Sequence, residues 1–173
     1  MNRLLFRVLW RITKEENRER LLRKQGVKIG EKCVINRDVV FSSEPYLITI
    51  GDHARIAAGV KFCTHDGGMG VLRVYKDDMK KADKFGPICI GNNVHLGWNT
   101  IIMPGVTIGD NCVIGCGSIV TKDIPANTVA CGVPAKPIKS IEEYYQSNIS
   151  LVQHTANMDR ESKKKFLLEK WRR

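Results

Sequence analysis

Residues 88–124 read ICIGNN VHLGWN TIIMPG VTIGDN CVIGCG SIVTKD I and repeat with a period of six. The third residue of every block is aliphatic: Ile90, Leu96, Ile102, Ile108, Ile114 and Val120. A period of six fits neither an amphipathic helix nor a long alternating strand. It fits short straight segments that each bury one branched side chain and meet at tight corners, where glycine costs least. The stretch therefore predicts a repeat architecture.

Three such segments make one triangular coil, and successive coils stack about 4.8 Å apart through parallel backbone pairing. Residues 27–62 carry a weaker version of the pattern, whose inward positions are Ile29, Ile35, Phe41, Ile50, Ile56 and Phe62. Pro45, Tyr46 and Leu47 add about three residues to this first set, so they must bulge at a corner. The two sets together predict roughly four coils.

The hexads resemble those of the hexapeptide-repeat acyltransferases, and most of all the galactoside, maltose and capsular-polysaccharide O-acetyltransferase branch. The resemblance covers residues 27–139 and is carried by HLGW (95–98), IGCGSIVTKDIP (114–125) and GVPAKPIK (132–139). It implies a mainly β fold, a left-handed parallel β-helix, here with an N-terminal helix and C-terminal helices. The left hand comes from the resemblance alone, because crossovers between parallel strands are usually right-handed.

The composition is ordinary for a soluble globular protein, with 173 residues, 43% hydrophobic and 27% charged. A net charge of +10 favours anionic partners: a phosphorylated cofactor, an acidic membrane surface or nucleic acid. No nucleic-acid motif accompanies the charge and few aromatic residues are interleaved with the lysines, so we expect no nucleic-acid partner.

The cysteines are scattered through the repeats without CxxC pairs, at positions 33, 63, 89, 112, 116 and 131. We interpret them as free thiols in a reducing cytoplasm. His53 and His65 are two hexads apart, on different faces of a triangular coil, and should not converge on one ion. We therefore expect no metal.

Residues 1–26 predict an N-terminal amphipathic helix, because Leu5, Val8, Leu9 and Ile12 recur at helical spacing. The helix is too short and too charged to span a bilayer, and its arginines interrupt any signal-peptide core. Two interpretations stay open. The apolar face packs against the β-helix, or it makes weak contact with the anionic inner face of a membrane, with Phe6 and Trp10 as anchors and Arg3, Arg7 and Arg11 beside them.

Residues 63–87 interrupt the repeat. We expect an excursion over 66–87 that reaches away from the prism and over a neighbouring subunit, because structureless loops of this length are uncommon unless functional or disordered. Pro134 and Pro137 predict an extended path that leaves the coil. Residues 140–173 predict a C-terminal helical extension, with Ser140 as a helix cap and a second helix from about Asp159.

His65 is the candidate catalytic residue, since it ends a hexad and opens the excursion. A lone histidine is more often structural, but the acetyltransferases that this chain resembles place their essential histidine at the corresponding point. Imidazole suits a general base at neutral pH, which would take the proton of the attacking hydroxyl. The residue that orients its other nitrogen stays open; Asp66 is adjacent in sequence.

The resemblance also implies acetyl-CoA as the acyl donor, lying in a groove between two prisms of a homotrimer. The matched cofactor-binding positions are Trp98, Cys116, Thr121, Lys122, Lys136 and Lys139. The last two stand where the family often has arginine, so they would supply charge without a bidentate fork. Trp98 departs from the small residue common at its position.

The sequence thus predicts a cytoplasmic, acetyl-CoA-dependent O-acetyltransferase that acts on a hydroxyl of a saccharide or a similar small acceptor. Two alternatives remain: N-acyl transfer to an amino sugar, and a non-catalytic β-helix scaffold.

Overall fold

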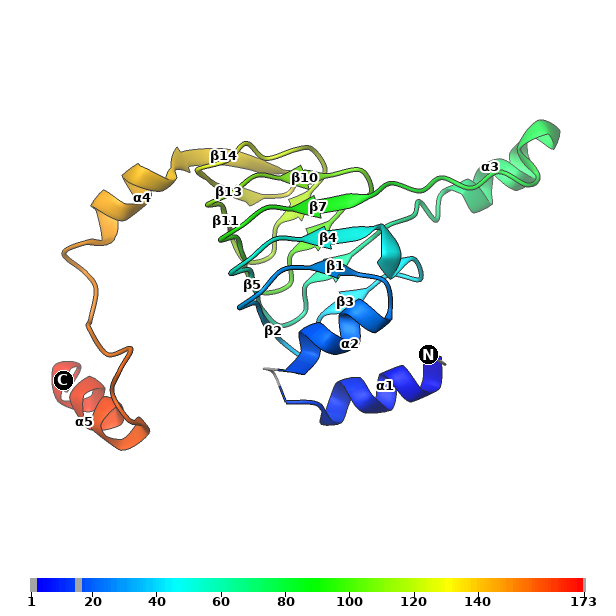
Figure 1. The fold of residues 1–173 in the computed structure, drawn as a ribbon. Coiled ribbons are helices and arrows are strands. Elements are labelled where there is room, and N and C mark those ends of the chain that lie inside the picture. The colour runs from blue at the N-terminus through cyan, green and yellow to red at the C-terminus, as the bar shows by residue number, and fades with distance from the viewer. Residues whose placement is uncertain (1–2, 15–16, 173) are drawn as a thin grey trace.

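The computed structural model describes residues 3–14 and 17–172, and the side chains from Val8 onward. The chain winds into a triangular prism with three sheets (Figure 1). Sheet A contains β1 (Lys28–Ile29), β4 (Ile48–Ile50), β7 (Ile88–Ile90) and β10 (Thr107–Ile108). Sheet B contains β2 (Val34–Ile35), β5 (Arg55–Ile56), β8 (His95–Leu96), β11 (Val113–Ile114), β13 (Thr128–Gly132) and β14 (Ala135–Ser140). Sheet C contains β3 (Val40–Phe41), β6 (Lys61–Phe62), β9 (Ile101–Ile102) and β12 (Ile119–Val120).

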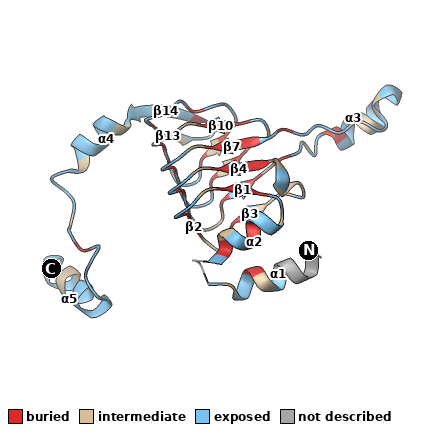
Figure 2. Ribbon diagram, viewed as in Figure 1, coloured by how far each residue is buried: buried red, intermediate tan, exposed pale blue. Residues whose placement is uncertain are grey.

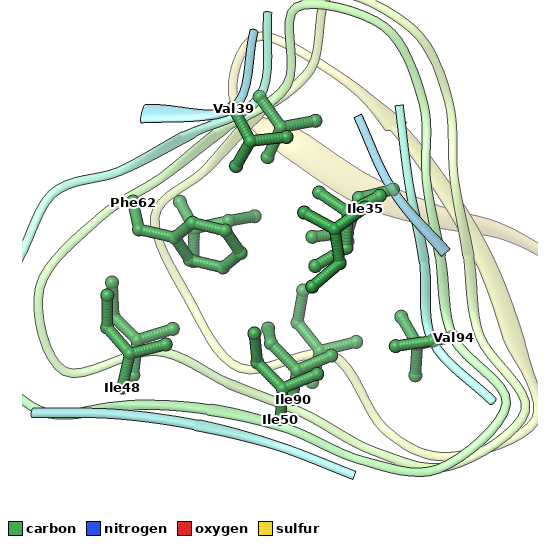
Figure 3. Close-up of a cluster of buried hydrophobic side chains, with 14 of the residues drawn as sticks. Ile35, Val39, Ile48, Ile50, Phe62, Ile90 and Val94 are labelled. Carbon is green, nitrogen blue, oxygen red and sulfur yellow. The ribbon is translucent and has the colours of Figure 1, made fainter. Parts of the chain in front are cut away.

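The predicted inward residues form the core. All six aliphatic residues of the 88–124 hexads are at most 3% exposed, as the repeat requires. The first set is buried as well, except that Phe41 is only partly covered. Figure 3 shows Ile50 lying next to Ile90 of the neighbouring coil, with Phe62 reaching in from another side. Each fully buried side chain of this kind contributes about 1.5–3 kcal/mol through removal from water.

The stacking of equivalent corners shows where the coils differ. In an uninterrupted coil the Asn92 N–H donates to Asp110 Oδ1, 18 positions further along the chain. The equivalent hydrogen bond from Glu31 to Asp52 spans 21 positions, and the one from Asp52 to Asn92 spans 40 positions. The additional residues belong to the predicted bulge, which is the 3-10 turn η2 (Pro45–Leu47), and to the predicted excursion. Both lie where the chain passes from sheet C to sheet A, which we call the C–A corner.

The corner between sheets A and B is built from residues with positive φ, which are Lys32, His53, Asn93, Asn111 and Asn127. Asparagine tolerates this backbone conformation better than most residues. Side-chain amides join successive coils there, because Asn93 Nδ2 donates to Asn111 Oδ1 at 2.9 Å. His53 occupies the same structural position, well separated along the coil from the C–A corner.

The N-terminal segment forms two helices, α1 (Arg3–Ile12) and α2 (Arg18–Lys24), instead of the single helix that the sequence predicted. They lie beside the first coil of the prism (Figure 1). The predicted apolar face was wrong in part: Trp10 is 7% exposed, whereas Val8 and Ile12 are 52% and 72% exposed. The Trp10 indole is held because its Nε1–H donates to the Arg37 carbonyl at 2.7 Å.

Leu9 is partly buried against the core, so α1 does pack on the β-helix, through the side that carries Leu9 and Trp10. The side chains of Arg3, Leu5, Phe6 and Arg7 lie outside the described residues. None of the described helices is long and apolar enough to cross a membrane.

The path through Pro134 and Pro137 is extended, as predicted, but the prediction that it leaves the coil was wrong. Instead of leaving, the chain turns back and β14 pairs antiparallel with β13, which extends sheet B. Two helices then follow as predicted: α4 (Ile141–Asn148), with Ser140 and Glu143 forming a capping box, and α5 (Arg160–Lys170), capped by Asp159. Figure 2 shows these helices as mostly exposed, away from the buried interior of the prism.

The excursion contains α3 (Met69–Tyr75) and a 3-10 turn, η3 (Asp77–Met79). It projects from the C–A corner as an arm that reaches away from the prism (Figure 1). Its apolar side chains are largely exposed, with Val71 at 71% and Val74 at 90%. All six cysteines are free thiols.

Candidate active site

The C–A corner places His65 and Glu44 in neighbouring coils. Phe41 and Phe62 are paired inward residues of β3 and β6, and their rings stack with centroids 5.2 Å apart. Glu44 follows Phe41 by three residues, and His65 follows Phe62 by three residues. The two side chains therefore meet at one corner, although 21 positions separate them in the sequence.

The base of the arm holds the His65 backbone in place. The Asp66 N–H donates to the Lys84 carbonyl, and the Gly86 N–H donates to the Thr64 carbonyl, each at 2.9 Å. His65 pairs with Phe85 across this two-stranded neck, and their rings meet edge to face at 6.4 Å. The His65 side chain is therefore attached to a hydrogen-bonded, two-stranded segment and not to a free loop.

The His65 imidazole lies against the Glu44 carboxylate, with 2.9 Å between Nδ1 and Oε2. The Thr64 hydroxyl, which is fully buried, donates to the same Oε2 at 2.8 Å. Ser42 Oγ lies 3.2 Å from Nδ1. When Nδ1 carries the proton and donates it to Glu44, Nε2 keeps its lone pair and is free to accept a proton.

Glu44 is suited to this role because it stays ionised. Desolvation of its carboxyl would raise the pKa, but hydrogen bonds from His65, Ser43 and Thr64 oppose it, and the pKa ends below its usual value. The side chain of Glu44 is 15% exposed, against 44% for His65. The arrangement is an accessible base supported by a largely covered carboxylate.

Asp66, the neighbour in sequence, does not fill this position. Its carboxylate accepts from the Gly68 N–H at 2.9 Å and lies 3.4 Å from Lys84 Nζ. The backbone hydrogen bond from Gly68, followed by Lys84, lowers the pKa of Asp66. Asp66 therefore stabilises the backbone at the start of the arm, and Glu44 is the carboxylate that contacts the imidazole.

Sequence reasoning did not single out Glu44, although a signal was present. Counting from the inward residues gives the same offset for Glu44 and His65, three positions after Phe41 and Phe62. Residues at equal offsets on one face of successive coils stack in a column. A search for acidic partners one coil away from His65 would have found Glu44.

The six predicted cofactor positions lie at three places. Trp98 and Cys116 stack at the corner between sheets B and C, where the Gly117 N–H donates to the Trp98 carbonyl at 2.7 Å. Thr121 and Lys122 follow β12 at the C–A corner, two coils further along than His65. Lys136 and Lys139 lie on β14. One chain therefore does not gather these residues into a single pocket.

These positions fit an extended phosphorylated ligand better than a compact one. Trp98, Cys116, Thr121, Lys122, Lys136 and Lys139 are all exposed. Gly117 has a φ of +71° and open space where a side chain would stand, so backbone is accessible beside Cys116. The lysines supply positive charge that phosphate groups need.

Among the residues that the structure describes, no three His, Cys, Asp or Glu side chains come together as a metal site.

Known proteins share this architecture. A family profile described as "Hexapeptide repeat of succinyl-transferase" matches residues 87–122. Protein CapG of Staphylococcus aureus is 44% identical over 99% of this chain and 97% of its own length. The galactoside O-acetyltransferase of Escherichia coli is 38% identical over 74% of this chain and 70% of its own length. The chain belongs to the hexapeptide-repeat acetyltransferases.

A solved structure extends the likeness to the fold. A hexapeptide-repeat acetyltransferase of Vibrio cholerae, crystallised with acetyl-coenzyme A, matches with a TM-score of 0.65 and 26% identity, over 79% of this chain and 83% of the other. The fold is the left-handed parallel β-helix with helices at both ends that the family resemblance implied, and the protein is an acyltransferase.

Proposed function

We propose that the protein transfers an acetyl group from acetyl-CoA to a hydroxyl of a saccharide or a similar small acceptor, with His65 as the general base. The observation that carries the proposal is the 2.9 Å contact between His65 Nδ1 and Glu44 Oε2 at the base of the arm. It explains how a lone, accessible histidine is held in the tautomer that a base requires. The E. coli relative, named a galactoside O-acetyltransferase, supports the acceptor class.

The proposed reaction makes use of this geometry. A sugar hydroxyl is a poor nucleophile while it keeps its proton, so Nε2 removes that proton as the oxygen attacks the thioester carbonyl. The imidazole becomes positively charged, and the Glu44 carboxylate stabilises that charge at Nδ1. The C–S bond then breaks, and Nε2 returns the proton to the departing thiolate. No acyl-enzyme is needed, so the free cysteines are not required as nucleophiles.

For acetyl-CoA, we assign the six exposed positions described above. Trp98 and Cys116 flank the pantetheine path, Thr121 and Lys122 continue it beyond the C–A corner, and Lys136 and Lys139 hold phosphate groups. The acetyl-CoA complex of the V. cholerae protein, with 26% identity, supports the donor.

The experiment that tests the function compares wild type with His65→Ala in a thiol-release assay. Hydroxyl and amine acceptors are screened in parallel, so that N-acyl transfer is scored separately. Loss of a general base predicts a decrease in kcat of about 10²–10⁴-fold with the fold intact. His154→Ala is the control, since His154 is an exposed residue between α4 and α5. Near-normal turnover by folded His65→Ala refutes the assignment.

We also propose a homotrimer, because the cofactor positions are spread over three places of one prism and the arm exposes an apolar surface. Closed three-fold symmetry would bring an arm and a neighbouring prism together over the seam. Sedimentation of an active monomer at assay concentration would contradict this.

Cytoplasmic location and weak contact with the inner face of a membrane stay proposals. With Trp10 packed on the β-helix, the described residues that remain for such contact are the exposed Val8, Arg11 and Ile12. Flotation with anionic vesicles at low salt tests the contact, with a variant lacking residues 1–20 as control. A full-length protein that stays in the soluble fraction would exclude it.

A further inference from the structure

A cavity lies between the N-terminal helices and the first coil, and borders the candidate active site. Its volume is about 450 Å³, within the range of small-molecule sites. Residues of α1, of α2 and its end, and of the segment from Arg37 to Pro45 line it. Ser42 and Ser43 line the cavity too, and their hydroxyls lie 3.2 and 3.5 Å from His65 Nδ1. The cavity therefore reaches the Nδ1 side of the His65 ring, and the acceptor hydroxyl would meet Nε2 of the same ring.

Part of the cavity lining is aromatic and packs on the core. The Trp10 ring meets the Phe41 ring edge to face, with centroids 6.0 Å apart, and Phe41 stacks on the buried Phe62. The indole N–H of Trp10 holds the Arg37 carbonyl at 2.7 Å, which fixes the backbone that carries the next lining residues. The shape of the cavity is thus set by the core of the first coils.

The polar part of the lining carries an excess of positive charge. Arg11 and Arg37 supply two guanidinium groups, against one carboxylate from Asp38. Within the described residues, no ion pair involves any of these three side chains. With two guanidinium groups against one carboxylate, the lining keeps a net positive charge.

Other basic residues of the same region make contacts within the fold. Arg18 donates to the Ile35 carbonyl at 2.5 Å, and Arg23 contacts Glu31 at 3.0 Å. Arg11 and Arg37 make no such contact among the described residues and line the cavity instead. Guanidinium groups recognise carboxylate and phosphate through paired hydrogen bonds.

We infer that this cavity selects an acidic saccharide, one that carries a carboxylate or phosphate group near the hydroxyl to be acetylated. Arg11 and Arg37 bind the acidic group, and Asp38, Gln25 and the two serines take neighbouring hydroxyls. The inference rests on the proposed function, since it takes His65 as the point to which the acceptor is delivered.

The test measures dissociation constants of three probes for the full-length protein by ligand-observed NMR. Methyl β-glucuronide carries a carboxylate, glucose 1-phosphate a phosphate, and methyl β-glucoside no charge. We expect at least one acidic probe to bind about tenfold more tightly than the neutral one, with the preference decreasing as salt is raised. The acidic probe with the lower dissociation constant identifies the group, carboxylate or phosphate, that the two arginines bind.

Arg11→Gln and Arg37→Gln should each reduce the preference several-fold, whereas Arg20→Gln, on the exposed side of α2, removes the same charge and should preserve it. Equal affinities for the three probes, or no binding of any at millimolar concentration, overturn the inference. An acid preference that is unchanged in both arginine variants overturns it as well.

His65→Ala should keep the acid preference, which separates the two proposals. An intact preference without thiol release from any acceptor refutes the proposed function. Normal thiol release with equal affinities refutes the acidic cavity.

Discussion

The coils built from β7 to β12 and those built from β1 to β6 follow one sequence pattern but differ at a single corner. Of the later coils, one returns to the same place after 18 positions and the next after 16, as the hydrogen bonds from Asn92 to Asp110 and from Asn111 to Asn127 show. The two earlier coils need 21 and 40 positions between equivalent hydrogen-bonded residues, and the surplus emerges at the C–A corner. There it brings Glu44 to His65.

This difference suggests that the regular coils stabilise the protein and that the broken hexads build the site. Regular hexads bury one side chain per segment and keep every corner short. This arrangement stabilises the prism but forms no recess at the corners. The broken hexads lengthen two corners in adjacent coils, and a polar pair can then stand clear of the sheet. The following predictions test whether stability and chemistry separate along this line.

The largest expected effect is on stability, in the regular coils. Leu96 is fully buried, so Leu96→Ala should lower the free energy of unfolding by about 2–5 kcal/mol through lost burial and a cavity. Val34→Ala removes methyl groups from an outward position that is 37% exposed, and should cost much less. Urea unfolding measures both. Equal losses for the two variants would contradict the assignment of inward and outward positions.

The second prediction concerns the broken corner. Glu44→Gln should lower kcat by about 10²–10⁴-fold, because the amide no longer stabilises the imidazolium and does not fix the tautomer. The unfolding midpoint should stay close to that of wild type. Asp66→Asn is the matched control: its carboxylate lies near Lys84, so kcat should change little. A larger loss in Asp66→Asn than in Glu44→Gln would reverse the two roles.

These two predictions differ in how far the sequence supports them. Leu96 and its counterparts could be predicted as core because the hexad fixes which position points inward. His65 could be selected because the excursion begins there and because the family that the hexads resemble places its essential histidine at that point. The contact with Glu44 depends on the exact path of a bulge, and the pattern predicted only that Pro45–Leu47 bulges.

The N-terminal helix shows a second limit of the sequence. The apolar stripe predicted that Val8 and Ile12 would be covered, yet Trp10 is the buried residue. Periodicity defines an apolar arc but does not say which part of it meets the prism. Trp10 fills that part because its ring packs against Phe41 while its N–H finds the Arg37 carbonyl. Neither partner is visible from the helix sequence.

The third prediction tests the neck of the arm. A Cβ at Gly86 would lie 2.4 Å from the backbone nitrogen of Gly105, so Gly86→Ala must push the neck away from the next coil. Overpacking of this kind costs about 1–3 kcal/mol, and the displaced neck should lower kcat. Gly67→Ala, where nothing lies within 4 Å, is the control. Wild-type kcat in Gly86→Ala would show that the neck does not position His65.

A smaller effect is expected on β14, outside the broken corner. Replacing Lys136 and Lys139 with Ala should raise the KM for acetyl-CoA several-fold, roughly 1 kcal/mol, and weaken its salt dependence, with kcat less affected. Lys163 and Lys164 on α5 provide a control with the same change of charge. An unchanged KM would remove the two lysines from the cofactor site.

The smallest expected effect is on the pH dependence of stability and comes from His95. His95 points outward from β8 between Arg55 and Val113 of the neighbouring coils. Burial lowers its pKa below the usual 6.5, and Arg55 lowers it further.

The unfolded chain therefore binds a proton more readily than the folded one, and stability falls as the pH drops through 6.5 towards the folded pKa. His95→Gln should lose less stability than wild type between about pH 7.5 and about pH 5.5. Because His95 lies in a regular coil, its replacement should leave the pH dependence of kcat unchanged, and a shifted kcat profile would show that the two regions are coupled.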